Sequence, residues 1–336
     1  MSTNTALSPR PLIFAATRDG HRLPVLDVTD PRFAVPDDPE NLGRLFAQSA
    51  AQEQRNRRLP GFIMRFLLRR AAKQSLILRA LFSGDASFLD GVTTYVMKLG
   101  AELPAPYDSP MDKRVATSPH LTLLRLRTQQ VAKLLADALA PELANAKSAP
   151  LHLVNIAGGP AIDSMNALIL LRRRDGDLVR RPIVIDVLDQ DDAGPFFGGN
   201  ALTALMQDDA PLAGLDISFR HRHYDWNMPA SLDTLLGEAN AAGAIVGASS
   251  EGGLFEYGSD DAIVTNLAAL RAHHVSAVAG SVTSDDASQR RRITASRFKL
   301  HPRGLKGFAP LAGRGGWRIA HSESAQLSDQ VLLAAA

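Results

Sequence analysis

The sequence predicts an α/β protein with a mainly parallel sheet, preceded by a mostly helical N-terminal region. Three observations carry this prediction. Strand-like and helix-like segments alternate from Leu151 onward, apolar residues follow helical spacing in the part before it, and two strand-like segments close the chain. Such alternation is typical of a parallel sheet with helices on both faces, which binds ligands at the carboxyl ends of its strands.

The composition excludes several classes of protein. The chain has 336 residues, 37 Lys and Arg, 35 Asp and Glu, and no Cys. Its length predicts two folding units. A chain without Cys has no disulfide framework, no thiolate metal site and no Cys nucleophile. Because the formal charge is only +2, we expect no nucleic-acid partner.

The N-terminus and the apolar runs predict a cytoplasmic protein. Residues 1–16 lack the apolar run of a signal peptide. No stretch approaches the roughly 18 apolar residues that a membrane-spanning helix needs. We therefore expect a cytoplasmic location, no membrane partner and a small-molecule substrate, and we allow for a homodimer.

Residues 1–148 are predicted to form a cap that supplies substrate selectivity. Two strand-like segments flank the turn signal Asp19-Gly20, which predicts a β-hairpin. Asp38 is placed to cap a helix that reaches Ala51 or beyond. Further helices are expected over residues 88–99 and from Ser118-Pro119 onward.

One helix of the cap, predicted over residues 62–82, is conspicuously basic. Apolar residues recur at helical spacing, with Arg65, Arg69, Arg70 and Lys73 between them. The pattern is compatible with a membrane-surface or partner-binding helix. A core helix with solvated basic side chains is the interpretation that we favour.

Residues 149–336 are predicted to form the catalytic domain. Strands and helices alternate through most of this part, and a reversed pair of strands is expected at its end. The predicted strands cover residues 151–158, 182–189, 215–225, 244–250, 275–283, 317–324 and 330–335.

The first strand of this domain leads into a glycine turn that suits a ligand. Asn155 lies in the strand, Ala157-Gly158-Gly159-Pro160 form the turn, and a helix begins near Asp163. Glycine lets the backbone approach a ligand closely, and the first turn of a helix offers unpaired amides.

The next two strand ends carry side chains that suit adenosine. Asp186 and Asp189-Gln190 come at the end of the second strand, where a carboxylate can accept both ribose hydroxyls. Tyr224-Asp225-Trp226 end the third strand, where Asp225 can accept from an adenine amino group and Trp226 can stack on the ring. Three consecutive strand ends are therefore compatible with adenosine.

Residues 150–336 resemble the class I S-adenosylmethionine-dependent methyltransferases. The resemblance implies a Rossmann-like, seven-stranded mixed sheet with a reversed terminal hairpin, and S-adenosylmethionine as cofactor. It assigns the first loop to Gly158 and Gly159, the ribose ligand to Asp189 or Asp186, and the adenine contact to Asp225. The predicted cofactor-binding residues are Asn155, Ala157, Gly158, Gly159, Pro160, Asp186, Asp189, Gln190, Tyr224, Asp225, Trp226 and Ser249.

The first loop departs from the family pattern. Asn155 replaces the usual acid in the strand, and Ala157 and Ala161 replace glycines. In the family that acid helps to hold the ammonium group of the cofactor. The departure therefore weakens the expectation of an ammonium contact at Asn155.

The fourth strand end is the predicted reaction site. Ser249-Ser250-Glu251 are followed by two glycines and by Tyr257. We predict Glu251 to orient or deprotonate an acceptor, with Tyr257 as hydrogen-bond partner or lid and Ser250 beside them. No metal is predicted, since His221 and His223 lack a third ligand with suitable spacing.

The leading functional prediction is a methyltransferase acting on a small polar metabolite, with secondary metabolism as its setting. An alternative is an enzyme that cyclises S-adenosylmethionine to azetidine-2-carboxylate and methylthioadenosine, because Asn155 would leave the amine neutral. A non-catalytic binding or dimerisation module is a further alternative. A dinucleotide-binding reductase is disfavoured, since residues 158–163 do not follow the G-x-G-x-x-G pattern.

Overall fold

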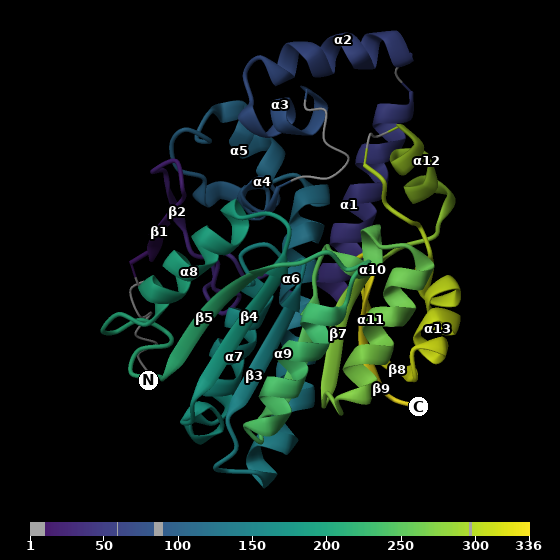
Figure 1. Cartoon of the computed structure of the whole chain (residues 1–336). Coiled ribbons are helices and arrows are strands. Elements are labelled where there is room, and N and C mark those ends of the chain that lie inside the picture. Colours follow the sequence, from purple (N-terminus) through teal and green to yellow (C-terminus); the bar gives the residue numbers. More distant parts are fainter. Residues whose placement is uncertain (1–10, 59, 84–89, 296–297) are drawn as a thin grey trace, which may run out of the picture.

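A computed structural model describes residues 11–58, 60–83, 90–295 and 298–336. Seven strands form its central sheet: β3 (Leu151–Ile156), β4 (Ile183–Asp189), β5 (Ile217–His223), β6 (Ile245–Ser250), β7 (Ala277–Thr283), β8 (Trp317–Ser324) and β9 (Ser328–Ala335). Their order is β5-β4-β3-β6-β7-β9-β8 (Figure 1). β3 to β7 are parallel, and β9 runs antiparallel to both β7 and β8. This confirms the predicted class I methyltransferase fold with its reversed terminal hairpin.

The parallel register brings the carboxyl ends of the strands to one edge of the sheet. Asn155 of β3 lies opposite Val187 of β4 on one side and Ser249 of β6 on the other. Asp189, the last residue of β4, lies opposite His223 of β5. The four predicted strand ends are therefore neighbours in space, as expected.

Helices cover both faces of the sheet. One face packs against α6 (Pro119–Asn145), α7 (Ile162–Arg174) and α8 (Ala193–Leu205), and the other against α9 (Ala230–Ala241), α11 (Asp260–Ala272) and α13 (Gly304–Arg314). All six residues of β3 are buried, because this central strand has helices on both sides. The short helices η2 (Gly176–Val179), α10 (Leu254–Tyr257) and α12 (Ala287–Ala295) complete this half.

The N-terminal region contains the predicted hairpin and helices. β1 (Phe14–Ala16) pairs with β2 (Arg22–Pro24), and Gly20 takes a φ of +85° in the turn between them. Asp38 caps α1 (Pro39–Arg57) by accepting from the amide of Asn41. The helix expected over residues 88–99 is α4 (Gly91–Val96), and the first two of those residues lie outside the described ones. The short elements η1 (Gly100–Glu102) and α5 (Pro110–Ala116) follow.

The single core helix expected over residues 62–82 is wrong in two respects. It is two helices, α2 (Gly61–Ala72) and α3 (Leu76–Ser83). Ser75 starts the second helix, because its hydroxyl accepts from the amide of Leu78 at 3.0 Å and donates to the carboxylate of Asp112 at 2.5 Å. Only α3 reaches the core, whereas Phe62 and Phe66 of α2 are 68% and 65% exposed.

The long helix α6 connects the N-terminal region to the sheet. Its Leu139 packs so closely on β6 that a Cβ on Gly247 would lie 2.9 Å from a methyl group of that leucine. One hydrophobic cluster runs from the N-terminal hairpin through α6 into β3 and β4. The domain boundary at residue 148 stays a prediction, and the packing across it is continuous.

None of the described helices is both long enough and apolar enough to cross a membrane. The longest, α6, carries buried polar side chains at Arg127, Thr128 and Gln130.

We predict that Asn166→Leu destabilises the fold by about 2–4 kcal/mol. The fully buried Asn166 of α7 accepts from the amide of Val28 at 2.7 Å and donates to the carbonyl oxygen of Leu26 at 2.9 Å. Leucine would leave both backbone groups buried without a partner. Urea unfolding measures the loss, and the exposed Asn56→Leu is the matched control. Equal stability of the two variants would contradict this assignment.

Candidate functional site

Asn155 organises the loop between β3 and α7. Its amide oxygen accepts from the backbone of Gly158 at 3.0 Å. Its amide nitrogen donates to Asp163 at 2.8 Å and to the hydroxyl of Ser249 at 3.1 Å. The side chain is fully buried, so Asn155 holds the loop and is directed at protein atoms.

This loop has an unusual backbone. Ala157, Gly159 and Ala161 all have φ between 53° and 58°. The left-handed conformation costs an alanine about 1–2 kcal/mol relative to glycine. The network around Asn155 holds two alanines in it, which is why the loop keeps a sharp turn without the full set of family glycines.

Asp189 lies where a ribose ligand is predicted. Its carboxylate accepts from the amide of Gly159 at 2.9 Å and from that of Asp191 at 2.9 Å. Burial raises its pKa, and these two backbone amides counteract the rise. The acidic end of β4 is thus joined directly to the glycine loop of β3.

Three glycines meet above this loop. A Cβ on Gly159 would lie 3.0 Å from the Cα of Gly91 in α4, and a Cβ on Gly194 of α8 would lie 2.9 Å from the Cα of Gly159. Asp191 fixes the contact, since it accepts from the amides of Gly91 at 3.0 Å and Gly194 at 3.1 Å. The first turn of α4 therefore covers the glycine loop.

The other predicted adenosine residues are divided between the interior and the surface. Asp186 is fully buried in β4, 2.7 Å from His152 and 3.0 Å from Arg222. Tyr224 is also buried and donates to Asn266 at 2.5 Å. Asp225 and Trp226 are half-buried at the end of β5. Residues that are at least partly open to solvent are Ala157, Gly158, Asp189, Gln190, Asp225 and Trp226.

Two serines at the end of β6 support the backbone. The hydroxyl oxygen of Ser249 accepts a hydrogen bond from the side-chain amide of Asn155. The hydroxyl of Ser250 donates to the carbonyl oxygen of Ile156 at 2.9 Å and accepts from the amide of Leu254 at 2.9 Å. Ser250 therefore supports the backbone of the loop.

For the ribose ligand, the geometry favours Asp189, which is partly open to solvent, over Asp186, which is fully buried.

Four charged side chains form a buried cluster beside the glycine loop, which we call the ion cluster. Glu251 pairs with Lys98, which follows α4, and with Arg127 of α6. Arg127 also contacts Glu256 at 3.1 Å. Each of these side chains is 4–7% exposed. Removing one member of such a buried group costs about 3–5 kcal/mol, because its partner stays charged in the interior.

The pKa values in the ion cluster move in opposite directions. Burial opposes ionisation of Glu251, but Arg127 and Lys98 outweigh it and lower the pKa of that carboxyl to about 2. For Glu256 burial prevails over Arg127, so its pKa is raised. Burial also raises the pKa of Tyr257, and the charge of Glu256 adds to this. Two carboxyls on one loop thus differ in how readily they take a proton.

Asp163 is the acid that the sequence analysis did not assign to the site. Asn155 donates to one of its carboxylate oxygens, while the other is buried without a hydrogen-bond partner. Burial raises its pKa to about 6, with a further contribution from the charge of Glu251. A buried carboxylate oxygen without a partner in the protein can accept from a water or from a ligand.

Sequence reasoning missed Lys98, Arg127, Asp163 and Glu256. A signal was present for the two cations, because each interrupts a run of apolar residues that otherwise packs inward. Nothing in the sequence indicated that they meet Glu251, since 153 residues separate Lys98 from it. The same packing explains Gly252, since a Cβ there would lie 2.6 Å from the guanidinium of Arg127, whereas a Cβ on Gly253 would lie 2.5 Å from the carbonyl oxygen of Ala157.

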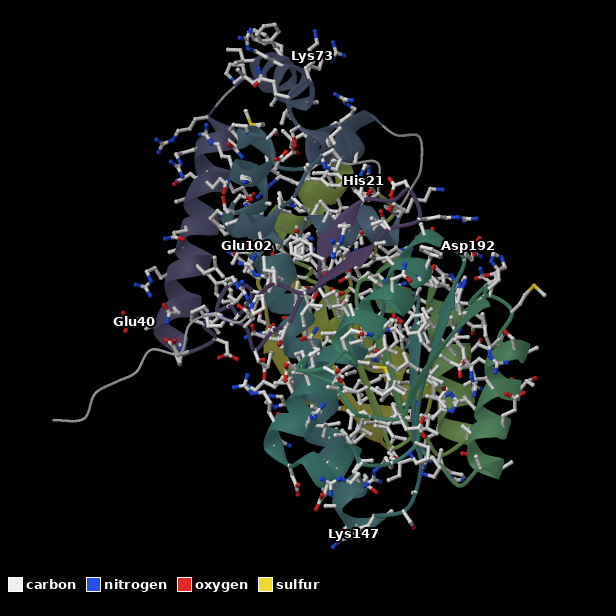
Figure 2. All side chains as sticks on the ribbon, turned by 90° about the vertical axis from the view of Figure 1, so that its left-hand side faces the viewer. His21, Glu40, Lys73, Glu102, Lys147 and Asp192 are labelled. Atoms are coloured by element: carbon white, nitrogen blue, oxygen red, sulfur yellow. The ribbon has the colours of Figure 1, made fainter. Side chains whose placement is uncertain are left out.

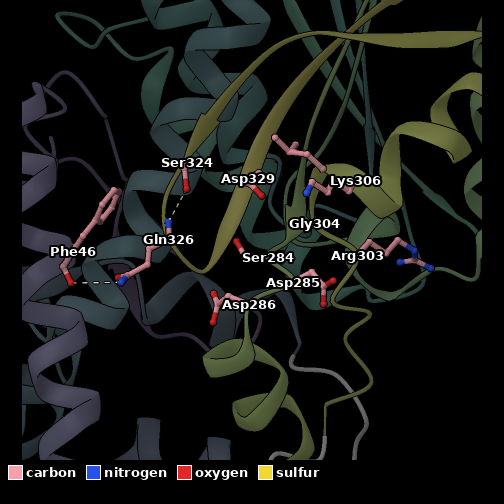
Figure 3. A pocket seen from close by; sticks show the side chains of 11 residues that line it. Phe46, Ser284, Asp285, Asp286, Arg303, Gly304, Lys306, Ser324, Gln326 and Asp329 are labelled. Atoms are coloured by element: carbon pink, nitrogen blue, oxygen red, sulfur yellow. Dashed lines mark hydrogen bonds between the residues drawn. The ribbon is translucent and has the colours of Figure 1, made fainter.

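Two surface cavities occur elsewhere. One of about 560 Å³ lies at the carboxyl end of β7, where Figure 3 shows Asp285, Lys306 and Asp329 around it. Burial raises the pKa of Asp329. The second, of about 400 Å³, lies between the N-terminal hairpin and Pro104-Ala105. Neither is lined by a predicted site residue.

The described part of the chain contains no group of three His, Asp or Glu that could hold a metal ion. His221 approaches the backbone oxygen of Asp189 at 3.0 Å, and the side chain of His223 is exposed. The expectation that no metal is bound stays a prediction.

The chain matches no protein-family model and no curated protein. Among solved structures it is similar to a possible exported protein from Bordetella parapertussis, with a TM-score of 0.55 and 14% identity over 89% of this chain and 99% of that one. It is also similar to an O-methyltransferase family protein from Burkholderia thailandensis, with a TM-score of 0.39 and 12% identity over 68% of this chain and 60% of that one.

A third similar structure is an O-methyltransferase from neocarzinostatin biosynthesis in complex with S-adenosylmethionine and a naphthoic acid. Its TM-score is 0.37, with 16% identity over 73% of this chain and 69% of that one. The match to the Bordetella protein shows a shared fold alone. It includes much of the N-terminal region, since it covers 89% of the chain. The TM-scores of the two methyltransferases are too low to support a conclusion about this chain.

We predict that Asp163→Asn changes how stability depends on pH. The pKa of Asp163 is raised from 3.8 to about 6 in the folded protein, so the folded state binds an extra proton between these values. Its contribution to stability is present below the lower value and is lost as the pH rises through the higher one. The parent should lose at most about 3 kcal/mol over this window through Asp163, and the variant should not.

Urea unfolding at several pH values between about 4 and 7 measures this difference. The exposed Asp177→Asn serves as the control, because its side chain is 76% exposed. Parallel pH profiles for the parent and Asp163→Asn would show that the Asp163 carboxyl is not perturbed.

Proposed function

We propose that this chain, which has the class I methyltransferase fold, is an S-adenosylmethionine-dependent methyltransferase that acts on a small polar metabolite. The observation that carries the proposal is the joint placement of Asp189 and of the charged side chains around Asp163 at one edge of the sheet. These two groups match the two polar ends of that cofactor.

The nucleoside end fits the partly open side of the edge. Asp189 has accepted two backbone amides, and an ionised carboxylate still has lone pairs for two ribose hydroxyls. Ala157 and Gly158 lie beside it, and Trp226 offers a half-buried aromatic face at the end of β5. The chemistry of the donors and acceptors therefore suits a ribose and a purine ring.

The amino-acid end fits the buried side. A zwitterion needs cations for its carboxylate and an acceptor for its ammonium group. Lys98 and Arg127 supply the cations, and the unpaired oxygen of Asp163 supplies the acceptor. In this proposal Asp163 takes over the role that the family gives to an acid at the position of Asn155.

Binding requires α4 to move. The backbone of Gly91 contacts Gly159, and the amide of Gly91 is held by Asp191. A ligand on the glycine loop would replace these contacts. We therefore propose that α4 withdraws when the cofactor enters and that Lys98, which follows it, exchanges Glu251 for the carboxylate of the ligand.

The residues of this chain would then position the acceptor. When bound, S-adenosylmethionine supplies a methyl group that is already activated on a sulfonium, so positioning is the main requirement. Glu251 is a poor base because its pKa is about 2, and we assign it to orientation through charge. Glu256, whose pKa is raised, is the better proton acceptor, with Tyr257 as its neighbour.

We place the acceptor in the cavity at the end of β7, because Arg303 in its lining donates to the carbonyl oxygens of Phe255 and Gly258, on either side of Glu256 and Tyr257. Asp285 and Asp329 offer acceptors there, and Lys306 offers a cation. This lining suits a small molecule with hydroxyl or amino groups rather than a flat apolar one. A place in secondary metabolism, a cytoplasmic location and a homodimer stay predictions, and the similarity to a possible exported protein does not favour the location.

The alternatives receive no support from the site. The argument for a cyclising enzyme depended on Asn155, and that side chain is directed at Gly158, Asp163 and Ser249. A non-catalytic module has no specific observation in its favour. The reversed terminal hairpin is not the second half of a dinucleotide-binding fold.

We predict that Asp189→Ala weakens binding of S-adenosylmethionine by about 10–100-fold, since two charge-assisted hydrogen bonds are lost. Isothermal titration of the purified chain measures the affinity. Asp216→Ala is the matched control, because this exposed acid precedes β5 at the opposite edge of the sheet. Analysis of the products then follows: release of S-adenosylhomocysteine that requires an acceptor supports transfer.

Two results would overturn the proposal. The parent chain could fail to bind S-adenosylmethionine at millimolar concentration, or Asp189→Ala could bind it with the same affinity as the parent and the Asp216→Ala control. Release of methylthioadenosine without an acceptor would instead support cyclisation.

A further inference from the structure

The basic side chains of this protein are concentrated in one short segment. Residues 54–84 contain eight Arg or Lys and no Asp or Glu. The rest of the chain has 29 basic and all 35 acidic residues, so it is net negative. The segment comprises the end of α1 together with α2 and α3, which lie at one end of the molecule, at the top of Figure 1. The near-neutral total charge therefore conceals a strongly basic end.

The same segment exposes large apolar side chains. Phe62 and Phe66 of α2 are 68% and 65% exposed, Leu67 is 44% exposed, and Phe82 of α3 is 56% exposed. Only Phe196 and Met228 are comparable elsewhere in the described residues. Exposed aromatic side chains that gather in one place are typical of a binding surface.

The aromatic and basic side chains of α2 share one face. At about 100° per residue, Phe62, Phe66, Arg69 and Lys73 fall within an arc of about 60°. Arg69, Arg70 and Lys73 are exposed, and none of them is paired with an acid among the described residues. Figure 2 shows Lys73 at this end of the molecule, away from the sheet. We call this exposed face of α2 the aromatic-basic face.

We propose that the aromatic-basic face docks on an anionic lipid surface. A helix that lies in the membrane interface buries aromatic and aliphatic side chains at the boundary of the acyl chains, while Lys and Arg contact the lipid phosphates. Phe62 and Phe66 supply the first part, and Arg69 and Lys73 the second. Such docking involves one face of one helix and needs no membrane-spanning segment.

The charge and shape of the face favour lipid over other anionic partners. α2 projects as a single helix at the outside of the molecule (Figure 1), which suits a planar surface. Single-stranded nucleic acid is bound in positively charged grooves, whereas the aromatic-basic face is the outer side of a single helix. The expectation of no membrane partner had two grounds, the lack of a membrane-spanning run and the placement of these side chains in the core; their exposure removes the second.

The test is co-sedimentation of the full chain with lipid vesicles. Vesicles of phosphatidylcholine are compared with vesicles in which about a third of the lipid is phosphatidylglycerol, at low salt and at about 0.5 M salt, where charge interactions are screened. We expect binding to the anionic vesicles alone, and a weaker partition at high salt.

Two double variants separate the parts of the face. Arg69→Glu with Arg70→Glu removes the charge, and Phe62→Ser with Phe66→Ser removes the apolar contact. Each should lower the partition coefficient at least about tenfold. Phe196→Ser with Arg220→Glu is the matched control, because both of these residues are exposed outside the segment, and it should retain the parent's binding. Circular dichroism and thermal unfolding check that every variant keeps the parent's fold.

A fluorescence measurement reports insertion directly. The chain has two Trp, at positions 226 and 317, and neither lies in the segment. A Phe66→Trp variant should gain blue-shifted emission on anionic vesicles that lipids with brominated acyl chains quench, whereas the parent should not.

The proposal is overturned by equal binding to neutral and anionic vesicles, by no binding to either, or by α2 variants that bind like the control. It is also overturned if the α2 variants lose binding to a single-stranded oligonucleotide while the parent does not bind vesicles. Self-association of the parent in light scattering that the Phe62 and Phe66 variants abolish, again without vesicle binding, would assign the face to a second copy.

Discussion

The contact between Arg127 and the two glutamates after β6 is the constraint on which the site depends. Arg127 comes from α6, and its partners come from the loop that ends the central strands. An unpaired charge in the interior is strongly destabilising, so α6 and this loop must take positions that keep Arg127 paired with the glutamates. Gly252 follows from it: at a φ of +74° and against the guanidinium, only glycine fits. The charge that raises the pKa of Asp163 comes from the same cluster.

The fold was predictable where periodicity and burial agree. β3 and β4 are mostly apolar and buried, as is typical of parallel central strands, and the terminal hairpin was visible because a short loop joins two strand-like segments at the end of the chain. Helical spacing failed at residues 62–82, because periodicity shows that a helix has an apolar face but not whether anything covers it. The new start at Ser75 had a local signal, since this serine caps α3 through the amide of Leu78, but its partner Asp112 is 37 residues away.

The sequence predicted which residues stand at each strand end, but not the contacts between residues that come from different elements. The turn at Gly158 and Gly159 and the acid at Asp189 are local in sequence, and the structure joins them through one hydrogen bond. Glu251 was selected for the loop it lies on, but its low pKa depends on Lys98 and Arg127, which come from two other elements. The sequence showed Asn155 only as a replacement for the family's acid. In the structure its side chain holds the loop by hydrogen bonds to Gly158 and Asp163, and Asp163 is itself an acid eight residues later in the chain.

The meeting of Gly91, Gly159 and Gly194 has a consequence for affinity. The structure has the first turn of α4 on the glycine loop, and the proposed function requires a second arrangement in which α4 has withdrawn. A ligand of this loop binds only the second arrangement, so its measured dissociation constant is the intrinsic value divided by the fraction of molecules that are open. A high measured dissociation constant could then result from a small open fraction of α4 as well as from a weak intrinsic affinity of the loop for its ligand. A change at the carboxylate of Asp191, which holds the amides of Gly91 and Gly194, would therefore shift this equilibrium and the measured affinity with it.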